Sequence, residues 1–333
     1  MPMNSAATYS IIITGGNTGL GFETAKIIGL DKDAMVVIAC RNPKLGQDAV
    51  ARLTAFGGRA AFLPLDLASQ ISIREFTEAY RNAGLPPLKG IICNAGMQSV
   101  AAPTRTIEGY ELTFAVNHLG HYLLTRLLLD DMEQDGRITF VSSGTHDPAE
   151  RLPVPSAVYE DAEKLAHDFE SSQKAGLRRY ATSKLCNIYC AYELSRRLST
   201  SGDFRLASIK VNAIDPGLMP ATGLTRSSPA PMQWIVRNVM PWLRLINDNV
   251  HSPETSAKRV AALTIGEDAA PGGRYFRNGK AVRSSEASYD GGKARELWVS
   301  SAAMTGLPSE LAEVGARGSR NASVQLNQQQ KHL

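Results

Sequence analysis

A short apolar, β-branched run passes directly into a glycine-rich turn near the start of the chain. The run covers residues 9–14, and the turn continues to residue 21 before a helical pattern resumes at Phe22. A buried strand, a glycine turn and a helix in that order begin a dinucleotide-binding βαβ unit, because glycines let the backbone approach a pyrophosphate at the helix N-terminus. The spacing is not the common G-x-G-x-x-G, so a plain tight turn stays an open alternative. The candidate cofactor-binding residues in this turn are Gly15, Asn17, Thr18, Gly19, Leu20 and Gly21.

The second strand signal, residues 34–39, indicates which dinucleotide would bind. It is followed by Arg41 and Lys44 and lacks the acidic residue that would bind a ribose 2′-hydroxyl. Cations at this place suit a 2′-phosphate, so the sequence predicts NADP(H) as the cofactor. The alternative for Arg41 is an ordinary solvated loop arginine.

Strand and helix signals alternate along most of the chain. Strands are expected at 60–65, 90–93, 137–142 and 206–214, and helices from about residue 69 and over 106–132. Such alternation predicts an α/β fold, a Rossmann-like doubly wound and mainly parallel sheet with helices on both faces. Ligands of such sheets bind beyond the C-terminal ends of the strands.

Polar or glycine-bearing residues follow several of the predicted strands. Each alone could be a turn or a helix N-terminal residue, but their recurrence at successive strand ends favours one binding site. The residues are Asp66 and Leu67, then Asn94, Ala95 and Gly96, then Ser142 and Ser143, and finally Asp215, Pro216 and Gly217.

A tyrosine and a lysine lie four positions apart in a helix-forming run. Tyr180 and Lys184 would share one helical face, since i and i+4 side chains are neighbours. The Lys184 cation is then expected to lower the Tyr180 pKa from its usual value near ~10 and make the phenol a usable acid or base. An exposed pair on a solvated helix is the alternative.

The C-terminal third carries elaborations on this fold. Residues 144–176 contain three prolines and an acidic helical segment near 159–169, and are expected to form an excursion over the sheet edge. An apolar patch at 232–246 is either a substrate lid or core. We predict one domain over 1–315, with the lid at about 226–250 and a disordered tail at 316–333.

Composition limits the classes of partner, such as nucleic acid, metal or membrane, that this chain is expected to bind. The chain has 333 residues and a formal net charge of +4 with no block of Lys and Arg, so nucleic acid is not expected. The four cysteines lie in apolar or helical surroundings; Cys186 and Cys190 could share a metal, but no His accompanies them, so no metal is predicted. The start lacks a signal-peptide pattern, and no run of about 18 apolar residues occurs, so a cytoplasmic protein without an integral membrane segment is expected.

Taken together, the glycine turn, Asn94-Ala95-Gly96, Asn117, Ser143 and the Tyr180/Lys184 pair resemble the short-chain dehydrogenase/reductase family. The resemblance covers roughly residues 8 to 312. It implies that Tyr180 is the general acid/base, Ser143 polarises the carbonyl, Lys184 binds the ribose and Asn117 supports a proton-relay water. Ser142 is the weaker alternative to Ser143. Such an enzyme transfers a hydride between NADP(H) and a carbonyl or alcohol.

Two branches of that family are similar to this chain. Asn117-His118-Leu119-Gly120-His121 and residues 297–300 resemble both retinol-dehydrogenase-type enzymes and light-dependent protochlorophyllide reductases. Residues 183–187, 222–224 with Arg226, and 252–259 resemble the second, and Thr222 joins the candidate cofactor residues. Where the pigment enzymes carry a cysteine after Pro-Gly, this chain has Leu218.

We therefore expect dark carbonyl/alcohol chemistry on a bulky apolar small molecule. Light-dependent reduction of protochlorophyllide is the alternative, and a catalytically silent NADPH-binding scaffold is a second. The resemblance also implies a possible homo-oligomer, or a monomer if the chain is nearer to the pigment enzymes.

Overall fold

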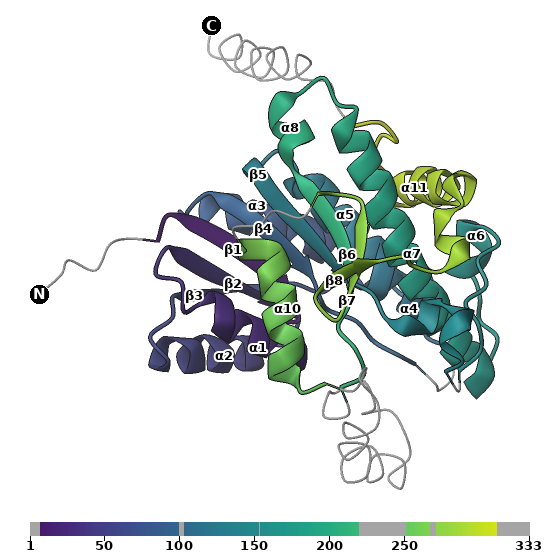
Figure 1. The fold of residues 1–333 in the computed structure, drawn as a ribbon, viewed down its shortest axis with the longest axis horizontal. Coiled ribbons are helices and arrows are strands. Elements are labelled where there is room, and N and C mark those ends of the chain that lie inside the picture. Colours follow the sequence, from purple (N-terminus) through teal and green to yellow (C-terminus); the bar gives the residue numbers. More distant parts are fainter. Residues whose placement is uncertain (1–6, 100–102, 153, 220–250, 267–270, 312–333) are drawn as a thin grey trace, which may run out of the picture.

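The computed structural model describes residues 7–99, 103–152, 154–219, 251–266 and 271–311, and they form one α/β domain around a single sheet (Figure 1). The sheet has eight strands in the order β3-β2-β1-β4-β5-β6-β7-β8. Neighbouring strands from β3 to β7 run parallel, and β8 pairs with β7 antiparallel. The predicted Rossmann-like, mainly parallel sheet is thus confirmed.

The strands are β1 (Tyr9–Thr14), β2 (Ala34–Cys40), β3 (Ala60–Pro64), β4 (Leu88–Cys93), β5 (Met132–Val141), β6 (Lys210–Asp215), β7 (Arg274–Arg277) and β8 (Lys280–Val282). The α-helices are α1 (Gly19–Ile28), α2 (Pro43–Ala55), α3 (Gln70–Asn82), α4 (Leu112–Phe114), α5 (Gly120–Leu128), α6 (Ala162–Ala166), α7 (Gln173–Ser199), α8 (Phe204–Ser208), α10 (Pro253–Ile265) and α11 (Gly291–Thr305).

Helices cover both faces of the sheet, as Figure 1 shows. Alternate β1 residues face opposite ways: Ile11 and Ile13 pack with α1 and α10, whereas Ile12 packs with α3, α5 and α7. All three isoleucines are fully buried. This two-sided burial explains why β1 reads as a continuous apolar run.

Strand order reverses between β1 and β4, because β2 and β3 lie on one side of β1 and all later strands lie on the other. A reversal of this kind opens a crevice beyond the C-terminal ends of the two central strands, where open α/β sheets bind their ligands. The glycine turn after β1 and the polar residues after β4 therefore meet at one place.

Local sequence signals set several element boundaries. The side chains of Asn42, Ser69 and Ser172 each accept a hydrogen bond from a backbone N–H in the first turn of α2, α3 and α7. Such caps satisfy donors that have no partner within the helix. Tyr180 and Lys184 both lie within α7.

Three predicted elements were wrong in extent. The helix expected over 106–132 begins at Leu112, becomes a π-helix over Ala115–Leu119 and ends at Leu128, because Met132 already belongs to β5. The strand expected over 206–214 begins only at Lys210, since α8 precedes it. The acidic segment 159–169 is helical only over Ala162–Ala166.

The remaining predictions about segments fall largely outside the described residues. The apolar patch 232–246, the lid range 226–250 and the tail 316–333 all lie there. In the excursion, α6 packs near α11, and the Tyr159 hydroxyl donates to Glu296 Oε2 at 2.5 Å. The excursion is therefore held against the body of the protein by the C-terminal helix.

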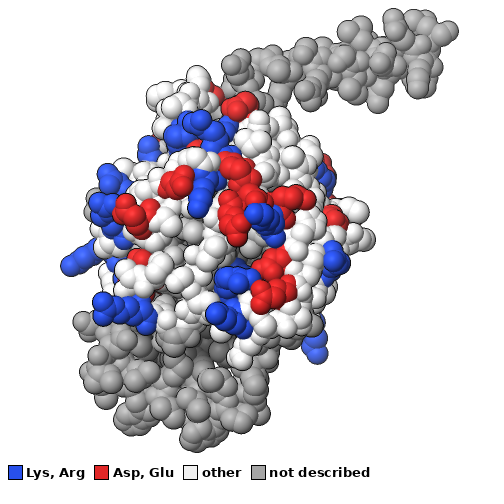
Figure 2. Space-filling model, turned by 90° about the vertical axis from the view of Figure 1, so that its right-hand side faces the viewer, with Lys and Arg blue, Asp and Glu red and all other residues white. Residues whose placement is uncertain are grey.

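Charged side chains of both signs are interspersed on the face shown in Figure 2. Exposed ion pairs such as Lys164–Glu160 at 2.7 Å contribute little to stability. No helix in the described ranges is both long enough and apolar enough to cross a bilayer.

Candidate active site

The glycine turn after β1 has a backbone that only glycines adopt readily. Gly15 and Gly19 have φ values of 64° and 55°. A Cβ on Gly21 would lie 2.5 Å from the Gly15 carbonyl oxygen, so the first turn of α1 packs directly on the loop. Thr18, the N-cap residue of α1, makes no side-chain capping bond, which leaves the first N–H groups of the helix to other acceptors. These features fit a dinucleotide pyrophosphate.

Thr14 fastens this turn to the loop after β4. Its Oγ1 accepts hydrogen bonds from the backbone N–H groups of Asn94 and Ala95, both at 2.9 Å. Asn94 Nδ2 donates to the Thr14 carbonyl oxygen at 2.8 Å. The predicted cofactor residues of the two strands are therefore in contact, with Ala95 Cβ 3.2 Å from the position of a Cβ on Gly15.

The residues predicted to select the cofactor lie at the ends of β2 and β3. Arg41 and Lys44 are exposed just beyond β2. Asp66 is half-buried, and its Oδ1 accepts a hydrogen bond from the Ala68 N–H at 3.0 Å, while Leu67 is buried. The Arg41 and Lys44 side chains lie outside the core and are accessible to the phosphate of a bound ribose.

Asn117 lies in the π-helix, a distortion that is frequent at functional sites. Its side chain is fully buried; Oδ1 accepts from the Met97 N–H at 2.8 Å, and Nδ2 donates to the Met97 carbonyl and to Ser183 Oγ, both at 2.9 Å. The Asn117 carbonyl lies 3.1 Å from His121 Nδ1, and His121 Nε2 lies 2.8 Å from Thr14 Oγ1. Asn117 thus links the loop after β4, the glycine turn and α7.

Tyr180, Ser143 and Lys184 come together between the end of β5 and the middle of α7. The Tyr180 hydroxyl lies near Ser143, whose side chain acts to lower the Tyr180 pKa. Lys184 Nζ lies 5.6 Å from the centre of the Tyr180 ring and donates to the Val141 carbonyl at 3.1 Å. Ser142 points elsewhere, because its Oγ donates to the Lys184 carbonyl at 2.8 Å. Ser143 is therefore the serine that shares a site with Tyr180.

Protonation in this site differs from the expectation that Lys184 lowers the Tyr180 pKa. Burial raises the pKa of Tyr180 to about 12, opposed by the Ser143 hydrogen bond and reinforced by the Asp215 carboxylate. Burial also lowers the pKa of Lys184 to about 8, and Asp215 opposes that change. The prediction was wrong because loss of hydration raises the Tyr180 pKa, and the Lys184 cation is not among the groups that act on it appreciably.

The turn after β6 closes the site. Gly217 has φ 81°, and Ser256 Oγ at the start of α10 donates to the Pro216 carbonyl at 2.6 Å. Leu218 is 44% exposed and the chain returns beside it, with the His251 N–H donating to the Leu218 carbonyl at 3.0 Å. Thr222 lies outside the described residues.

Comparison with known proteins bears on this arrangement. The sequence profile described as short chain dehydrogenase matches residues 9–157. The chain is 34% identical over 306 residues to a polyprenol dehydrogenase of Danio rerio, covering 89% of this chain and 86% of the relative. The chain belongs to the short-chain dehydrogenase family. It is thus an oxidoreductase.

Other relatives resemble this short-chain dehydrogenase over most of its length. A protochlorophyllide reductase A of Oryza sativa subsp. japonica is 30% identical over 321 residues, covering 89% of this chain and 80% of the relative. A crystal structure of an uncharacterised protein from Mycobacterium paratuberculosis is 26% identical with a TM-score of 0.67, covering 92% and 96% of the two chains. The ketoreductase LanV with bound NADP, at 20% identity and TM-score 0.59 over 82% and 95%, shows the same fold.

The short-chain dehydrogenase site also contains charged residues to which the sequence analysis gave no role. Asp215, Arg277, Glu150 and His146 gather behind Ser143. His146 Nδ1 lies 2.6 Å from the Ser143 carbonyl, so this buried imidazole holds the serine's backbone. The sequence places Asp215 only in the strand-end run Asp215-Pro216-Gly217, with no role of its own, and Arg277 lies on a four-residue strand that has no clear sequence signal.

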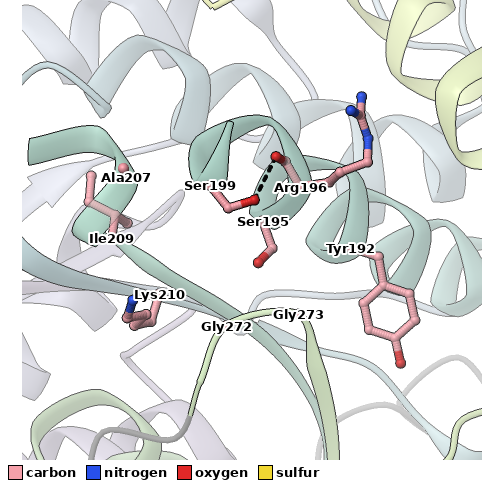
Figure 3. A pocket seen from close by; sticks show the side chains of 9 residues that line it. All are labelled: Tyr192, Ser195, Arg196, Ser199, Ala207, Ile209, Lys210, Gly272 and Gly273. Carbon is pink, nitrogen blue, oxygen red and sulfur yellow. Dashed lines mark hydrogen bonds between the residues drawn. The ribbon is translucent and has the colours of Figure 1, made fainter. Parts of the chain in front are cut away.

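A separate cavity of about 300 Å³ lies at the other end of the sheet (Figure 3). Ile209 and Lys210 at the start of β6, Gly272 and Gly273 before β7, and Ser195 of α7 line it. Tyr180 and Ser143 lie instead at the C-terminal ends of the strands. This cavity is therefore not the catalytic site.

Proposed function

We propose that this short-chain dehydrogenase reduces the carbonyl group of a bulky apolar small molecule with NADPH. The observation that carries the proposal is the buried Tyr180 phenol, which lies near Ser143 and has Lys184 Nζ 5.6 Å from its ring centre. A buried phenol whose pKa is raised to about 12 is protonated at neutral pH, which is the form that can donate a proton.

In this proposal each residue of the site has a separate role in the reaction. When bound, the nicotinamide supplies or accepts the hydride. Ser143 Oγ donates a hydrogen bond to the carbonyl oxygen and stabilises the negative charge that develops there. Tyr180 gives its proton to the same oxygen, and the neighbouring Lys184 ammonium stabilises the phenolate that is left. Asn117 holds the loop at Met97 and Ser183 in place around them.

The preference for NADPH rests on Arg41 and Lys44, the two exposed cations beyond β2. Their ammonium and guanidinium groups are suited to the 2′-phosphate that distinguishes NADPH from NADH. The Asn94–Gly96 loop and the glycine turn would hold the rest of the dinucleotide, and Gly96 leaves room for Lys184, whose Nζ would be 3.2 Å from a Cβ at that position.

Two observations support an apolar substrate. A relative that is 34% identical is named polyprenol dehydrogenase, whose substrate by that name is a long apolar alcohol. The apolar residues at 232–246, which include Trp234 and Trp242, follow the strand end at Asp215 in sequence. We propose that they form the lid over this substrate.

A screen of NADPH oxidation tests the proposal. Short and long aliphatic aldehydes, steroid ketones, retinal, polyprenal and protochlorophyllide would each be supplied in darkness, with Tyr180→Phe as the control protein. We expect turnover that increases with the apolar size of the carbonyl compound. Tight NADPH binding with no turnover of any compound would contradict the proposal and support a silent scaffold.

Light-dependent reduction of protochlorophyllide is the second candidate, because relatives with that name are 30–31% identical over most of the chain. Leu218, at the position after Pro216-Gly217, has no polar atom with which to donate a proton or bind the pigment. We expect no reduction of the pigment in light. Illuminating protein, NADPH and protochlorophyllide decides this: accumulation of the red-shifted product over many turnovers would promote this candidate over the first.

A further inference from the structure

The buried carboxylate of Asp215 lies at the end of β6, and only one of its two oxygens has a hydrogen-bond partner among the described residues. Asp215 is 3% exposed, and its Oδ1 accepts a hydrogen bond from the Gly217 N–H at 2.9 Å. Its Oδ2 is 3.5 Å from Arg277 Nε, and neither atom has a hydrogen-bond partner among the described residues. Arg277 Nη2 instead pairs closely with Glu150 Oε1 at 2.6 Å. Burial raises the pKa of the Asp215 carboxyl, and the Gly217 N–H and the Arg277 guanidinium act against that rise. Arg277 therefore balances the Asp215 carboxylate only in part.

Sheet register places this carboxylate directly behind the catalytic residues. Ile214 pairs with Val141 in the parallel ladder between β5 and β6, and Lys184 donates to the Val141 carbonyl. A Cβ on Gly144, the residue after Ser143, would lie 3.1 Å from Asp215 Oδ2. Asp215 thus lies against the turn that carries Ser143 and one strand residue away from the Lys184 contact.

Titratable groups face Asp215 from every element that packs around it. They are Tyr275 and Arg277 on β7, His146 and Glu150 in the short helices after β5, and Tyr180 and Lys184 on α7. Of these, Arg277 and Lys184 are the cations. Burial lowers the pKa of Lys184 and raises that of Tyr180, and the Asp215 carboxylate opposes the first change and adds to the second. Among the described residues it is the one charged side chain that acts appreciably on both.

We propose that Asp215 is a positioning residue of the active site: its carboxylate, held between the Gly144 turn and Arg277, keeps Lys184 charged and Tyr180 protonated during carbonyl reduction. The catalytic role given to Asp215 rests on the proposed function. The proton that Tyr180 gives to the substrate oxygen must be present before each turnover, and a nearby negative charge stabilises that proton-loaded form. Asp215 does not touch the substrate and acts through Lys184 and Tyr180.

A purely structural role for Asp215 is the competing explanation, since Oδ1 also caps the Pro216–Gly217 turn. Asp215→Asn separates the two roles, because the amide oxygen can accept the same bond from Gly217 while the charge is lost. Asp215→Ser, with a hydroxyl acceptor in the same turn, is a second variant. Glu150→Gln is the comparison variant, as it removes a carboxylate from the same cluster that does not itself act on Lys184. Because it also frees Arg277 to approach Asp215, its effect on Lys184 should be smaller than that of removing Asp215.

The titration of Lys184 tests the proposal without any substrate. The protein would carry lysine labelled with ¹³C at Cε, and Lys184→Met would assign the resonance. We expect a wild-type midpoint of about 8, lowered by about one unit in Asp215→Asn and Asp215→Ser and lowered by clearly less in Glu150→Gln.

A Lys184 midpoint that is unchanged in a folded Asp215 variant, or that falls equally in Glu150→Gln, would overturn the proposal. Because the measurement needs no turnover, it is independent of whether the proposed reaction is found. If reduction of an aldehyde such as decanal is detected, its rate should fall as the pH rises through the Lys184 midpoint. That fall should begin at a lower pH in Asp215→Asn than in the wild type, with Glu150→Gln staying close to the wild type.

Discussion

The glycine turn and the catalytic corner lie at the same end of the sheet but are built in different ways. The turn is one contiguous stretch whose backbone shape makes the site, with Gly15 and Gly19 at positive φ and Thr14 tying it to Asn94. The corner brings side chains from β5, α7, β6 and β7 together, and burial sets the protonation of Tyr180 and Lys184. The first region depends on shape, and the second on which charges are buried together.

Replacing Ser143 should separate the two regions most clearly. Ser143→Ala removes the hydroxyl that is proposed to stabilise the carbonyl oxygen beside Tyr180, and loss of one such donor lowers kcat by about 10²–10³-fold. NADPH affinity, which depends on the glycine turn, should be unchanged. Ser142→Ala is the control: its Oγ contacts only the α7 backbone carbonyl, so it should reduce thermal stability and leave kcat nearly intact. The reverse pattern would exchange the roles of the two serines.

The glycine turn should be sensitive to an added side chain, because its role depends on the shape of its backbone and not on a reactive group. In Gly21→Ala the new Cβ would meet the Gly15 carbonyl at 2.5 Å and Asn94 Nδ2 at 2.6 Å. We expect a loss of about 1–3 kcal/mol of stability and weaker NADPH binding. Gly291→Ala, also in the first turn of a helix but with no atom within 4 Å, should be neutral. Equal melting temperatures and cofactor affinities for both variants would show that the turn tolerates bulk.

Two buried histidines predict a dependence of stability on pH: His121, whose Nε2 lies 2.8 Å from Thr14 Oγ1 beside the glycine turn, and His118, whose Nε2 lies 2.9 Å from Ser301 Oγ of α11. Burial lowers the pKa of His118 to about 3 and that of His121 to about 4, with the Lys184 charge also acting on His121. A histidine with a lowered folded-state pKa stabilises the fold above its unfolded pKa of ~6.5, and that stability is lost as pH falls below it. By pH 5 the loss is about 2 kcal/mol for each.

Chemical denaturation at pH 7.5 and pH 5 measures this loss. His118→Asn should reduce the difference between the two pH values, whereas replacing the exposed His167 by Asn should leave it unchanged. A difference that is the same in all three proteins would mean that buried carboxylates, not these histidines, control acid stability.

The smallest expected effect concerns Arg41, the exposed cation just beyond β2 that is proposed to bind the 2′-phosphate. Arg41→Ala should raise the NADPH dissociation constant about 10-fold, since a charge-assisted hydrogen bond contributes about 1.5–3 kcal/mol. NADH affinity should barely change. Arg283→Ala is the control, at an exposed arginine that pairs with Glu286 at 3.5 Å and lies over the Tyr289 ring, away from β2. Equal wild-type affinity for NADPH and NADH would remove the basis of the predicted preference.

The difference between the regions also explains what the sequence could predict. The strand, turn and helix at residues 9–28 follow from adjacent residues, and the polar residues predicted at successive strand ends do lie at the same end of the sheet in the structure. The protonation of Tyr180 did not follow, because it depends on burial and on Asp215, which lies 35 positions away along the chain. The π-helix at Asn117 and the Arg277 strand depend on tertiary contacts that leave no periodic signal.

Single-turnover reduction by Tyr180→Phe tests the central claim most directly. Enzyme saturated with NADPH would be mixed with the best carbonyl substrate from the screen, and nicotinamide oxidation followed in the wild type and in Tyr180→Phe. The variant keeps the buried ring and loses only the hydroxyl that meets Ser143. We predict a fall of about 10²–10⁴-fold in the chemical step with unchanged NADPH affinity. A wild-type rate in the variant, with chemistry shown to limit that rate, would contradict the assignment of Tyr180 as the proton donor.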